Sequence, residues 1–299
     1  MPTFDLSAAN LPMVRAGIEA QLAELPTPDL PVVLETIDVP ATARTPALRV
    51  FAYRPMNASS VLPAILHIHG GGYVVGSPKM MDNAHRQTVA DLGCALFAVE
   101  YRLAPESPFP AAIEDCYAAL AWLHANAMVL AIDPARLGVM GESAGGGLAA
   151  SLALLTRDRG QVPLAFQHLI YPAIDDRTCL LPDPHPFTGE FIWTRASNIF
   201  GWSSLLGAPP GGADVSIYAA AARAMDLAGL PPAYIAVGAL DLFLEENLDY
   251  ARRLTRAGVP VELHVYPGAV HGFQQALTAR TSIAAESHSR NALRRALYG

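Results

Sequence analysis

The sequence has little charge of either sign, and the charge that it has is more acidic than basic. Charged residues make up 16% of the 299 residues, and the formal net charge is −7. No basic stretch offsets that charge, so we expect neither nucleic acid nor an anionic membrane surface as a partner. The hydrophobic content of 52% indicates a sizeable buried core and argues against a disordered or filamentous chain.

Cysteines and long apolar runs are also scarce. The three cysteines, Cys94, Cys116 and Cys179, are an odd number without close pairs, so neither a disulfide framework nor a zinc cluster is indicated. No apolar run is long enough to span a membrane without a charge or a proline, and residues 1–10 lack the basic start of a signal peptide. We therefore expect no membrane span and a cytoplasmic location.

Strand-like and helix-like patterns alternate along most of the chain. Apolar residues at Leu11, Val14, Ile18 and Leu22 predict an amphipathic helix within residues 7–25. Two antiparallel strands are expected next, at 32–39 and 48–53. Strands separated by helical patterns then follow near 63–68, 94–100, 135–140, 164–170, 232–238 and 261–266. This order predicts an α/β fold over residues 1–299, with a mostly parallel central sheet and helices on both faces.

One long segment, from Tyr171 to about Ala213, breaks this alternation and is rich in aromatic residues. An insertion of this length inside a compact fold usually covers an active site. Its aromatic side chains either line a substrate pocket or only pack the insertion onto the core; they are Phe187, Phe191, Trp193, Phe200 and Trp202.

The pentapeptide Gly141-Glu142-Ser143-Ala144-Gly145 stands between an apolar strand and a run of small residues. A serine on a tight turn from a strand to a helix needs glycines on both sides, because the backbone is strained and nothing bulky fits there. The pattern therefore predicts a nucleophile elbow with Ser143 exposed at its tip. The N–H of Ala144, directly after the nucleophile, is an expected oxyanion donor.

Two further motifs agree with this interpretation. The strand at 63–68 leads into His69-Gly70-Gly71-Gly72, whose bare backbone N–H groups can face an oxyanion. Asp241 and then His271 each follow a strand, in the order serine, acid, histidine that α/β-hydrolases use. Ser143 is thus predicted as the nucleophile, His271 as its base and Asp241 as the acid.

The combination of these motifs with Tyr101-Arg102-Leu103-Ala104-Pro105-Glu106 resembles the hormone-sensitive-lipase-like carboxylesterases of bacteria, over about residues 45–275. The resemblance implies an α/β-hydrolase fold with a helical cap, here about residues 1–40 and 178–213. It also implies Gly71 and Gly72 as oxyanion donors. Glu142 stands where the family often has Asp, which bears on hydrogen bonding near the serine.

Several alternatives remain open from the sequence. Glu245, Glu246, Asp175 and Asp176 are rivals to Asp241 as the acid, and the two glutamates are interpreted as a solvated or capping face. His67 and His69 lie on one face of a strand, so they could bind a metal, but no third ligand has matching spacing. We interpret His69 as a structural anchor of the glycine loop and His67 as a hydrogen-bonded core residue.

The predicted function is hydrolysis of short- to medium-chain carboxylic esters through an acyl-enzyme, without cofactor or metal. Phe191, Trp193, Phe200 and Trp202 are the predicted substrate contacts in the cap. The alternatives are an amidase or peptidase on the same fold, or a non-catalytic receptor like the gibberellin receptor, in which the triad histidine is absent. A small-molecule ester is the expected partner, and a homodimer is possible.

Overall fold

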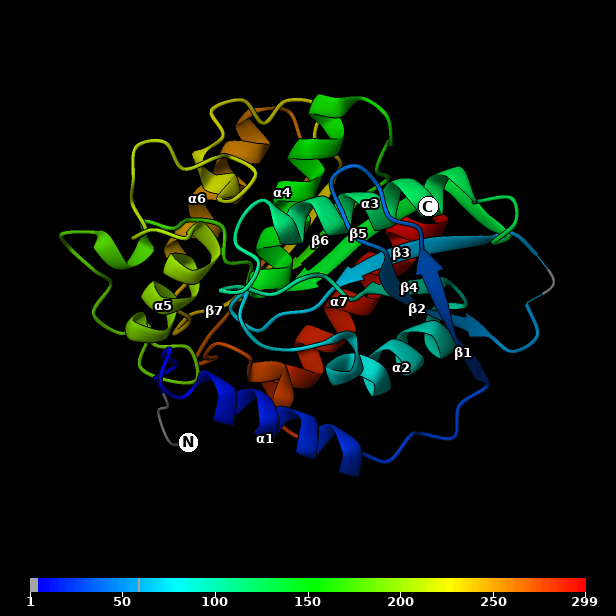
Figure 1. Ribbon diagram of the computed structural model, residues 1–299, viewed down its shortest axis with the longest axis horizontal. Helices are drawn as coiled ribbons and strands as arrows, with labels where there is room; N and C mark the ends of the chain where they lie inside the picture. Colours follow the sequence, from blue (N-terminus) through cyan, green and yellow to red (C-terminus); the bar gives the residue numbers. More distant parts are fainter. Residues whose placement is uncertain (1–4, 59) are drawn as a thin grey trace.

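A computed structural model of the chain describes residues 5–58 and 60–299 (Figure 1). Residues 1–4 of the predicted cap lie outside the described residues. The strands are β1 (Val32–Val39), β2 (Leu48–Pro55), β3 (Leu62–Ile68), β4 (Ala95–Val99), β5 (Ile132–Glu142), β6 (Gln167–Ile170), β7 (Ala233–Gly238) and β8 (Val261–Tyr266). The α-helices are α1 (Leu11–Glu24), α2 (Asp82–Leu92), α3 (Ala111–Ala125), α4 (Ala144–Arg159), α5 (Arg195–Leu206), α6 (Leu244–Arg256) and α7 (Arg280–Tyr298).

The eight strands form one sheet in the order β1-β2-β4-β3-β5-β6-β7-β8. β1 pairs with β2, and β2 with β4, in antiparallel fashion, while every other pair is parallel. The predicted mostly parallel sheet is confirmed, and the eight strands fall where the sequence predicts them, with differences at their ends. β5 begins earlier than predicted because Ile132 pairs with Leu62 of β3 before a register shift.

The side chains explain which strands are central and which lie at the edges. Every residue of β3 and of β4 is buried, as expected for parallel strands covered on both faces. The edge strand β1 exposes Glu35 and Asp38, and such charges keep an open edge from pairing with another chain. The core therefore lies at the middle of the sheet, next to the strands that carry the predicted site.

Helices cover both faces of the sheet. In Figure 1, α3, α4 and α6 lie above it, and α2 and α7 lie below. The main hydrophobic core contains side chains of α3, α4 and α6, and a second cluster joins α2 and α7 to the other face. α4 can approach closely because it begins with small residues, and a Cβ on Gly147 would lie 1.9 Å from the Ala173 carbonyl oxygen. This close packing fixes the helix that starts at the predicted nucleophile.

Two segments far apart in the sequence meet outside this framework. α1 lies along the outside of the molecule, and the insertion after β6 carries η2 (Thr178–Leu180) and α5 (Figure 1). Leu6 N donates to Ser197 Oγ at 2.9 Å, and Thr194 Oγ1 donates to Asp5 Oδ1 at 2.5 Å. The N-terminal segment and the insertion are therefore joined in one layer. Short 3-10 turns complete the chain at η1 (Pro78–Met81), η3 (Ala221–Arg223) and η4 (Phe273–Gln275).

Candidate active site

Ser143 occupies the turn between β5 and α4. Its backbone has φ 55° and ψ −123°, a strained conformation for a residue with a side chain. A Cβ on Gly145 would lie 2.0 Å from the Ile68 carbonyl oxygen, and one on Gly141 would lie 2.4 Å from the Gly145 carbonyl oxygen. The two glycines are thus required by space, and the turn is the strand-to-helix elbow that the sequence predicts.

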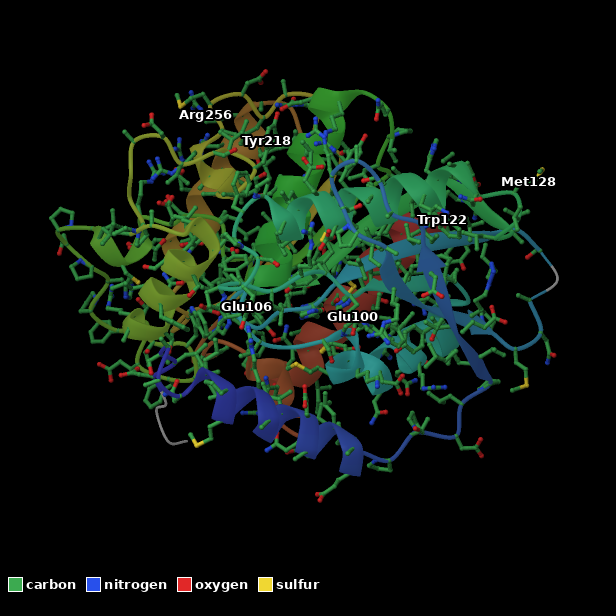
Figure 2. The ribbon with its side chains drawn as sticks, viewed as in Figure 1. Glu100, Glu106, Trp122, Met128, Tyr218 and Arg256 are labelled. Atoms are coloured by element: carbon green, nitrogen blue, oxygen red, sulfur yellow. The ribbon has the colours of Figure 1, made fainter. Side chains whose placement is uncertain are left out.

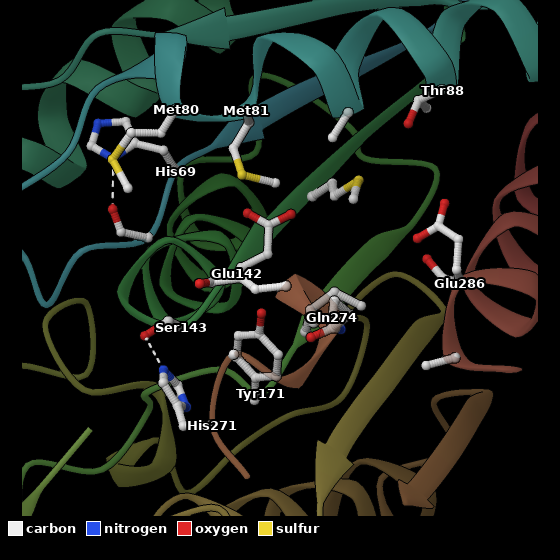
Figure 3. Close-up of a pocket in the computed structure, with 18 of the residues that line it drawn as sticks. His69, Met80, Met81, Thr88, Glu142, Ser143, Tyr171, His271, Gln274 and Glu286 are labelled. Carbon is white, nitrogen blue, oxygen red and sulfur yellow. Dashed lines mark hydrogen bonds between the residues drawn. The ribbon is translucent and has the colours of Figure 1, made fainter. Parts of the chain in front are cut away.

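The structure brings Ser143, His271 and Asp241 together in a hydrogen-bonded chain. His271 Nδ1 donates to Asp241 Oδ2 at 2.8 Å. Ser143 Oγ lies 2.9 Å from His271 Nε2, as the dashed line in Figure 3 marks. Because the carboxylate can only accept, Nδ1 carries the ring proton and Nε2 is free to take the proton of the serine hydroxyl. This is the arrangement that activates a serine as a nucleophile.

The acid and the base are both shielded from water. Asp241 has no exposed surface, and its other oxygen accepts from Phe243 N at 2.9 Å. The His271 ring packs between the ring of Phe243, 5.1 Å away, and the ring of Tyr171, 4.7 Å away. A buried carboxylate with fixed donors holds the imidazole in one tautomer and one orientation.

The aspartates that rival Asp241 have other partners. Asp175 forms an ion pair with Arg177 at 2.8 Å, and the fully buried Asp176 forms one with Arg223 at 2.6 Å. The acid in contact with His271 is Asp241. Both rival aspartates therefore belong to the base of the insertion.

Glu245 is exposed on α6, but Glu246 is buried and bonds to another segment, so the prediction of a solvated or capping face is wrong for Glu246. Its carboxyl group accepts from Ile174 N at 2.7 Å and from Thr178 Oγ1. Burial raises the pKa of Glu246 well above its usual range. The helical pattern gave no signal for this contact because Ile174 and Thr178 lie on a different segment.

The glycine loop, residues 70–75, begins in the same site, where Gly70, Gly71 and Gly72 line the cavity together with Ser143. Gly71 and Gly72 have φ of 123° and 59°, which favour glycine. Val74 N and Val75 N both donate to Gly71 O, at 3.1 and 3.0 Å, and so close the loop. Within residues 5–58 and 60–299, no hydrogen bond from the N–H groups of Gly71, Gly72 or Ala144 is found. These groups remain available to a ligand.

His69 anchors the start of this loop. Its Nδ1 donates to Gly70 O at 2.7 Å, and its ring stacks on Tyr101 at 4.3 Å. Burial lowers the pKa of His69 to about 4, so the ring is neutral at neutral pH.

Glu142 and His67 form a pair that the sequence did not specify. His67 Nε2 lies 3.0 and 2.9 Å from the two carboxylate oxygens of Glu142. Glu142 was expected to affect hydrogen bonding near the serine, and its carboxylate contacts His67 on β3. Across the part of the chain that the structure describes, no group of three or more His, Cys, Asp or Glu side chains is placed to hold a metal ion.

A cavity of about 430 Å³ opens beside Ser143 and His271 and runs between α2 and α7. Figure 3 shows Glu142 and Tyr171 near the serine, and Thr88 and Glu286 at the far end. The sequence missed these helix contributions, because α2 and α7 have the ordinary pattern of helices that cover a sheet. The side chains that α2, η1 and α7 contribute include Met80, Met81, Leu92, Glu286, Arg290 and Leu293.

Of the four aromatic residues predicted to contact substrate, Trp193 lines this cavity. Trp202 does not face it: the side chain is 1% exposed and packs on Tyr73 in the main core. Phe191 is 44% exposed, and Phe200 packs in the cluster beneath α1. Trp202 and Phe200 therefore pack the insertion onto the rest of the protein. Both lie on α5, which turns Trp202 to the core and Phe200 to α1.

A family model described as alpha/beta hydrolase fold matches residues 65–275. The chain is 36% identical to the esterase LipI of Mycobacterium tuberculosis over 268 residues, which cover 86% of this chain and 81% of that protein. It is also 36% identical to the carboxylesterase NlhH of the same species over 255 residues, 83% of this chain and 78% of that protein.

Solved structures give the same result over nearly the whole length. A bacterial heroin esterase is 41% identical with a TM-score of 0.92, and the match covers 100% of this chain and 95% of that one. The esterase LipW from Mycobacterium marinum is 33% identical with a TM-score of 0.87, over 99% of this chain and 92% of that one. None of the described helices combines the length and the apolar character needed to cross a membrane. The chain belongs to the hormone-sensitive-lipase-like family of the alpha/beta hydrolase fold, and it is a carboxylic ester hydrolase with a serine nucleophile.

Proposed function

We propose that the chain hydrolyses esters of short- to medium-chain carboxylic acids through an acyl-enzyme on Ser143. The observation that carries the proposal is the hydrogen-bonded chain Ser143, His271, Asp241 at one end of a mostly apolar cavity. A cavity of about 430 Å³ has room for a small ester, and its walls are fixed by two packed helices.

In the first half of the reaction, Ser143 Oγ attacks the ester carbonyl carbon while His271 Nε2 takes the hydroxyl proton. The carbonyl oxygen becomes an oxyanion, which the N–H groups of Gly71, Gly72 and Ala144 are proposed to bind. His271 then gives the proton to the leaving alcohol, and the acyl group remains on Ser143.

In the second half, a water molecule attacks the acyl carbon while His271 takes one of its protons. The second oxyanion collapses, the acid leaves, and the proton returns to Ser143 Oγ. Asp241 stabilises the imidazolium in both halves, because its buried carboxylate accepts the hydrogen bond from His271 Nδ1.

The length preference follows from the shape of the cavity. Each buried methylene contributes about 0.8 kcal/mol only until the apolar space is full. We expect kcat/KM for 4-nitrophenyl esters to rise and then fall from acetate to palmitate, and turnover to fall by about 10⁴-fold or more in Ser143→Ala. Equal or rising activity up to palmitate, or fast hydrolysis of emulsified long-chain triglyceride, would contradict the size limit.

The same series separates the alternatives. A 4-nitroanilide matched to the best ester tests amidase activity, and turnover of the ester alone supports the esterase. A receptor would bind the ester without turning it over. The cytoplasmic location and the homodimer expected from the sequence stay predictions, and gel filtration tests the second of them.

A further inference from the structure

α1 contacts the glycine loop, although the resemblance implied that this segment is part of a helical cap. No described residue of α1 lines the cavity. Leu11 is instead buried with Val74 and Val75, the residues that follow the glycines, in a small cluster that includes Ala104. The helix thus packs against the loop that carries the proposed oxyanion donors, on the side away from the substrate.

One side chain of α1 holds three groups of this region together. Arg15 Nε donates to Val74 O at 2.9 Å, and Nη2 donates to Ala104 O at 2.9 Å. Nη1 and Nη2 also form a bidentate pair with the Glu106 carboxylate at 2.7 and 2.9 Å. Figure 2 labels Glu106, the carboxylate partner of Arg15. Only the planar fork of an arginine offers donors in this arrangement.

The contact at Val74 reaches the proposed oxyanion donors through two short links. The N–H of Val74 and the N–H of Val75 donate to Gly71 O, so these residues form one hydrogen-bonded turn. Ala104 N donates to Tyr73 O at 3.0 Å, which ties the second acceptor of Arg15 to the same turn. A displacement of Val74 must therefore move the peptide groups of Gly71 and Gly72.

We propose that Arg15 is a positioning residue for the oxyanion site: it fixes the glycine loop, residues 70–75, so that Gly71 and Gly72 point their N–H groups at the developing oxyanion. The inference rests on the proposed ester hydrolysis and extends it to α1. An oxyanion donor acts only when its direction is fixed before charge develops, and a small misplacement lowers the rate. α1 then acts on turnover more than on substrate selection.

The test compares Arg15→Met with two controls. Glu106→Gln leaves Arg15 its two carbonyl acceptors, and the carboxylate removed is 61% exposed, where ion pairs contribute little. Arg44→Met removes an exposed arginine paired with Glu114 on another part of the surface. We expect kcat for a short ester to fall about tenfold in Arg15→Met with KM within about twofold, and both controls to stay within about twofold of wild type.

A second measurement separates positioning from a general structural role. Ser143 Oγ adds to the carbonyl carbon of a trifluoromethyl ketone with a short alkyl chain, and the serine proton passes to His271. The adduct then carries an oxyanion in the proposed site. The affinity for this ketone should fall in Arg15→Met by about the same factor as kcat/KM. Arg15→Lys, which keeps the charge but cannot serve both carbonyls, should show a smaller loss in the same direction.

The possible results separate a failure of this inference from a failure of the proposed ester hydrolysis. If wild type turns over the ester and binds the ketone, but both Arg15 variants match it in kcat and ketone affinity, Arg15 does not position the loop. A loss confined to KM, or to thermal stability with kcat and ketone affinity unchanged, overturns the inference as well. Absence of ester turnover in wild type would instead overturn the proposed function.

Discussion

The site has two walls, which are held in different ways. The histidine wall carries Ser143, His271 and Asp241, and the oxyanion wall is the glycine loop, residues 70–75. The acid and the base stand on loops that directly follow β7 and β8, and Asp241 takes a hydrogen bond from Phe243, two residues further along the chain. The glycine loop opposite depends on distant segments. Arg15 donates to Val74 O across 59 residues of sequence, and the ring of Trp193, in the insertion, packs closely on Gly72.

This difference shows which features of a site a sequence carries. The histidine wall is built on strand ends and neighbouring residues, so its parts are visible as motifs. The oxyanion wall has visible glycines, but the supports that orient them appear only after α1 and the insertion have docked. Substitutions in the two walls should therefore differ in the size of their effect and in what can restore activity.

The largest effect is expected in the histidine wall. Ser143→Ala and His271→Ala should each lower kcat by about 10⁴-fold or more, and Asp241→Asn by a somewhat smaller factor, because the three groups act as a unit. The double variant Ser143→Ala/His271→Ala should be no worse than either single variant. Steady-state kinetics on one short ester measures all four.

Asp175→Asn and Asp176→Asn serve as matched controls for Asp241→Asn. Each removes one carboxylate charge from a loop that follows β6, where the partners are Arg177 and Arg223. Their kcat should stay within about threefold of wild type. A larger loss in either control than in Asp241→Asn would reverse the assignment of the acid.

The features that the sequence predicts correctly include the strands and motifs that build the histidine wall. The buried strands β3 and β4 were predicted because parallel strands covered on both faces are nearly continuous apolar runs. Asp241 and His271 were predicted because each follows a strand, in the chain order serine, acid, histidine. The elbow was predicted because its glycines are needed for reasons of space within a few residues.

The rest depends on how helices dock, and periodicity does not encode that. Trp193 and Trp202 are nine residues apart in one aromatic segment, yet the first lines the cavity and the second is buried in the core. Nothing in the helical pattern around Arg15 marks this residue, because its acceptors are carbonyl oxygens of distant residues. The cavity wall from α2 and α7 was missed for the same reason.

An intermediate loss of kcat is expected for substitutions in the glycine loop. Two neighbouring glycines should differ in whether a second substitution restores the lost activity. A Cβ on Gly72 would lie 2.1 Å from the Trp193 ring, whereas one on Gly71 would lie 2.0 Å from the Val75 carbonyl oxygen. Gly72→Ala and Gly71→Ala should each lower kcat by about 10²-fold. Since only the first collision is with a side chain, Trp193→Leu should recover about tenfold of the loss in Gly72→Ala and none in Gly71→Ala.

Trp193→Leu alone provides the reference for this pair, because Trp193 also lines the cavity. Far-ultraviolet circular dichroism and a thermal melt of each variant separate loss of fold from loss of turnover. If the leucine change fails to restore Gly72→Ala in a protein that folds, the collision is not the cause. The glycine is then needed for its φ of 59°.

The smallest effect is expected where the insertion is fastened to α6. Glu246 is buried, and its pKa is raised by burial, so the folded protein keeps this carboxyl protonated over a range where the unfolded chain has ionised it. Below about pH 4.3 both states are protonated and the group contributes no pH dependence. As the pH rises above that value, the unfolded state gains stability by losing the proton, and the folded protein becomes relatively less stable.

Glu246→Gln removes that proton equilibrium while keeping an oxygen that can accept from Ile174 N. The difference in Tm between the variant and wild type should therefore increase in favour of the variant as the pH is raised from about 5 to 7. Each pH unit in this range is worth up to about 1.4 kcal/mol, or about 2–4 °C in a large domain. Glu245→Gln, an exposed neighbour, should give a Tm difference that hardly changes with pH. If the two variants show the same pH trend, Glu246 is ionised in the folded protein, and the attachment of the insertion is a charged contact like the ion pair at Asp176.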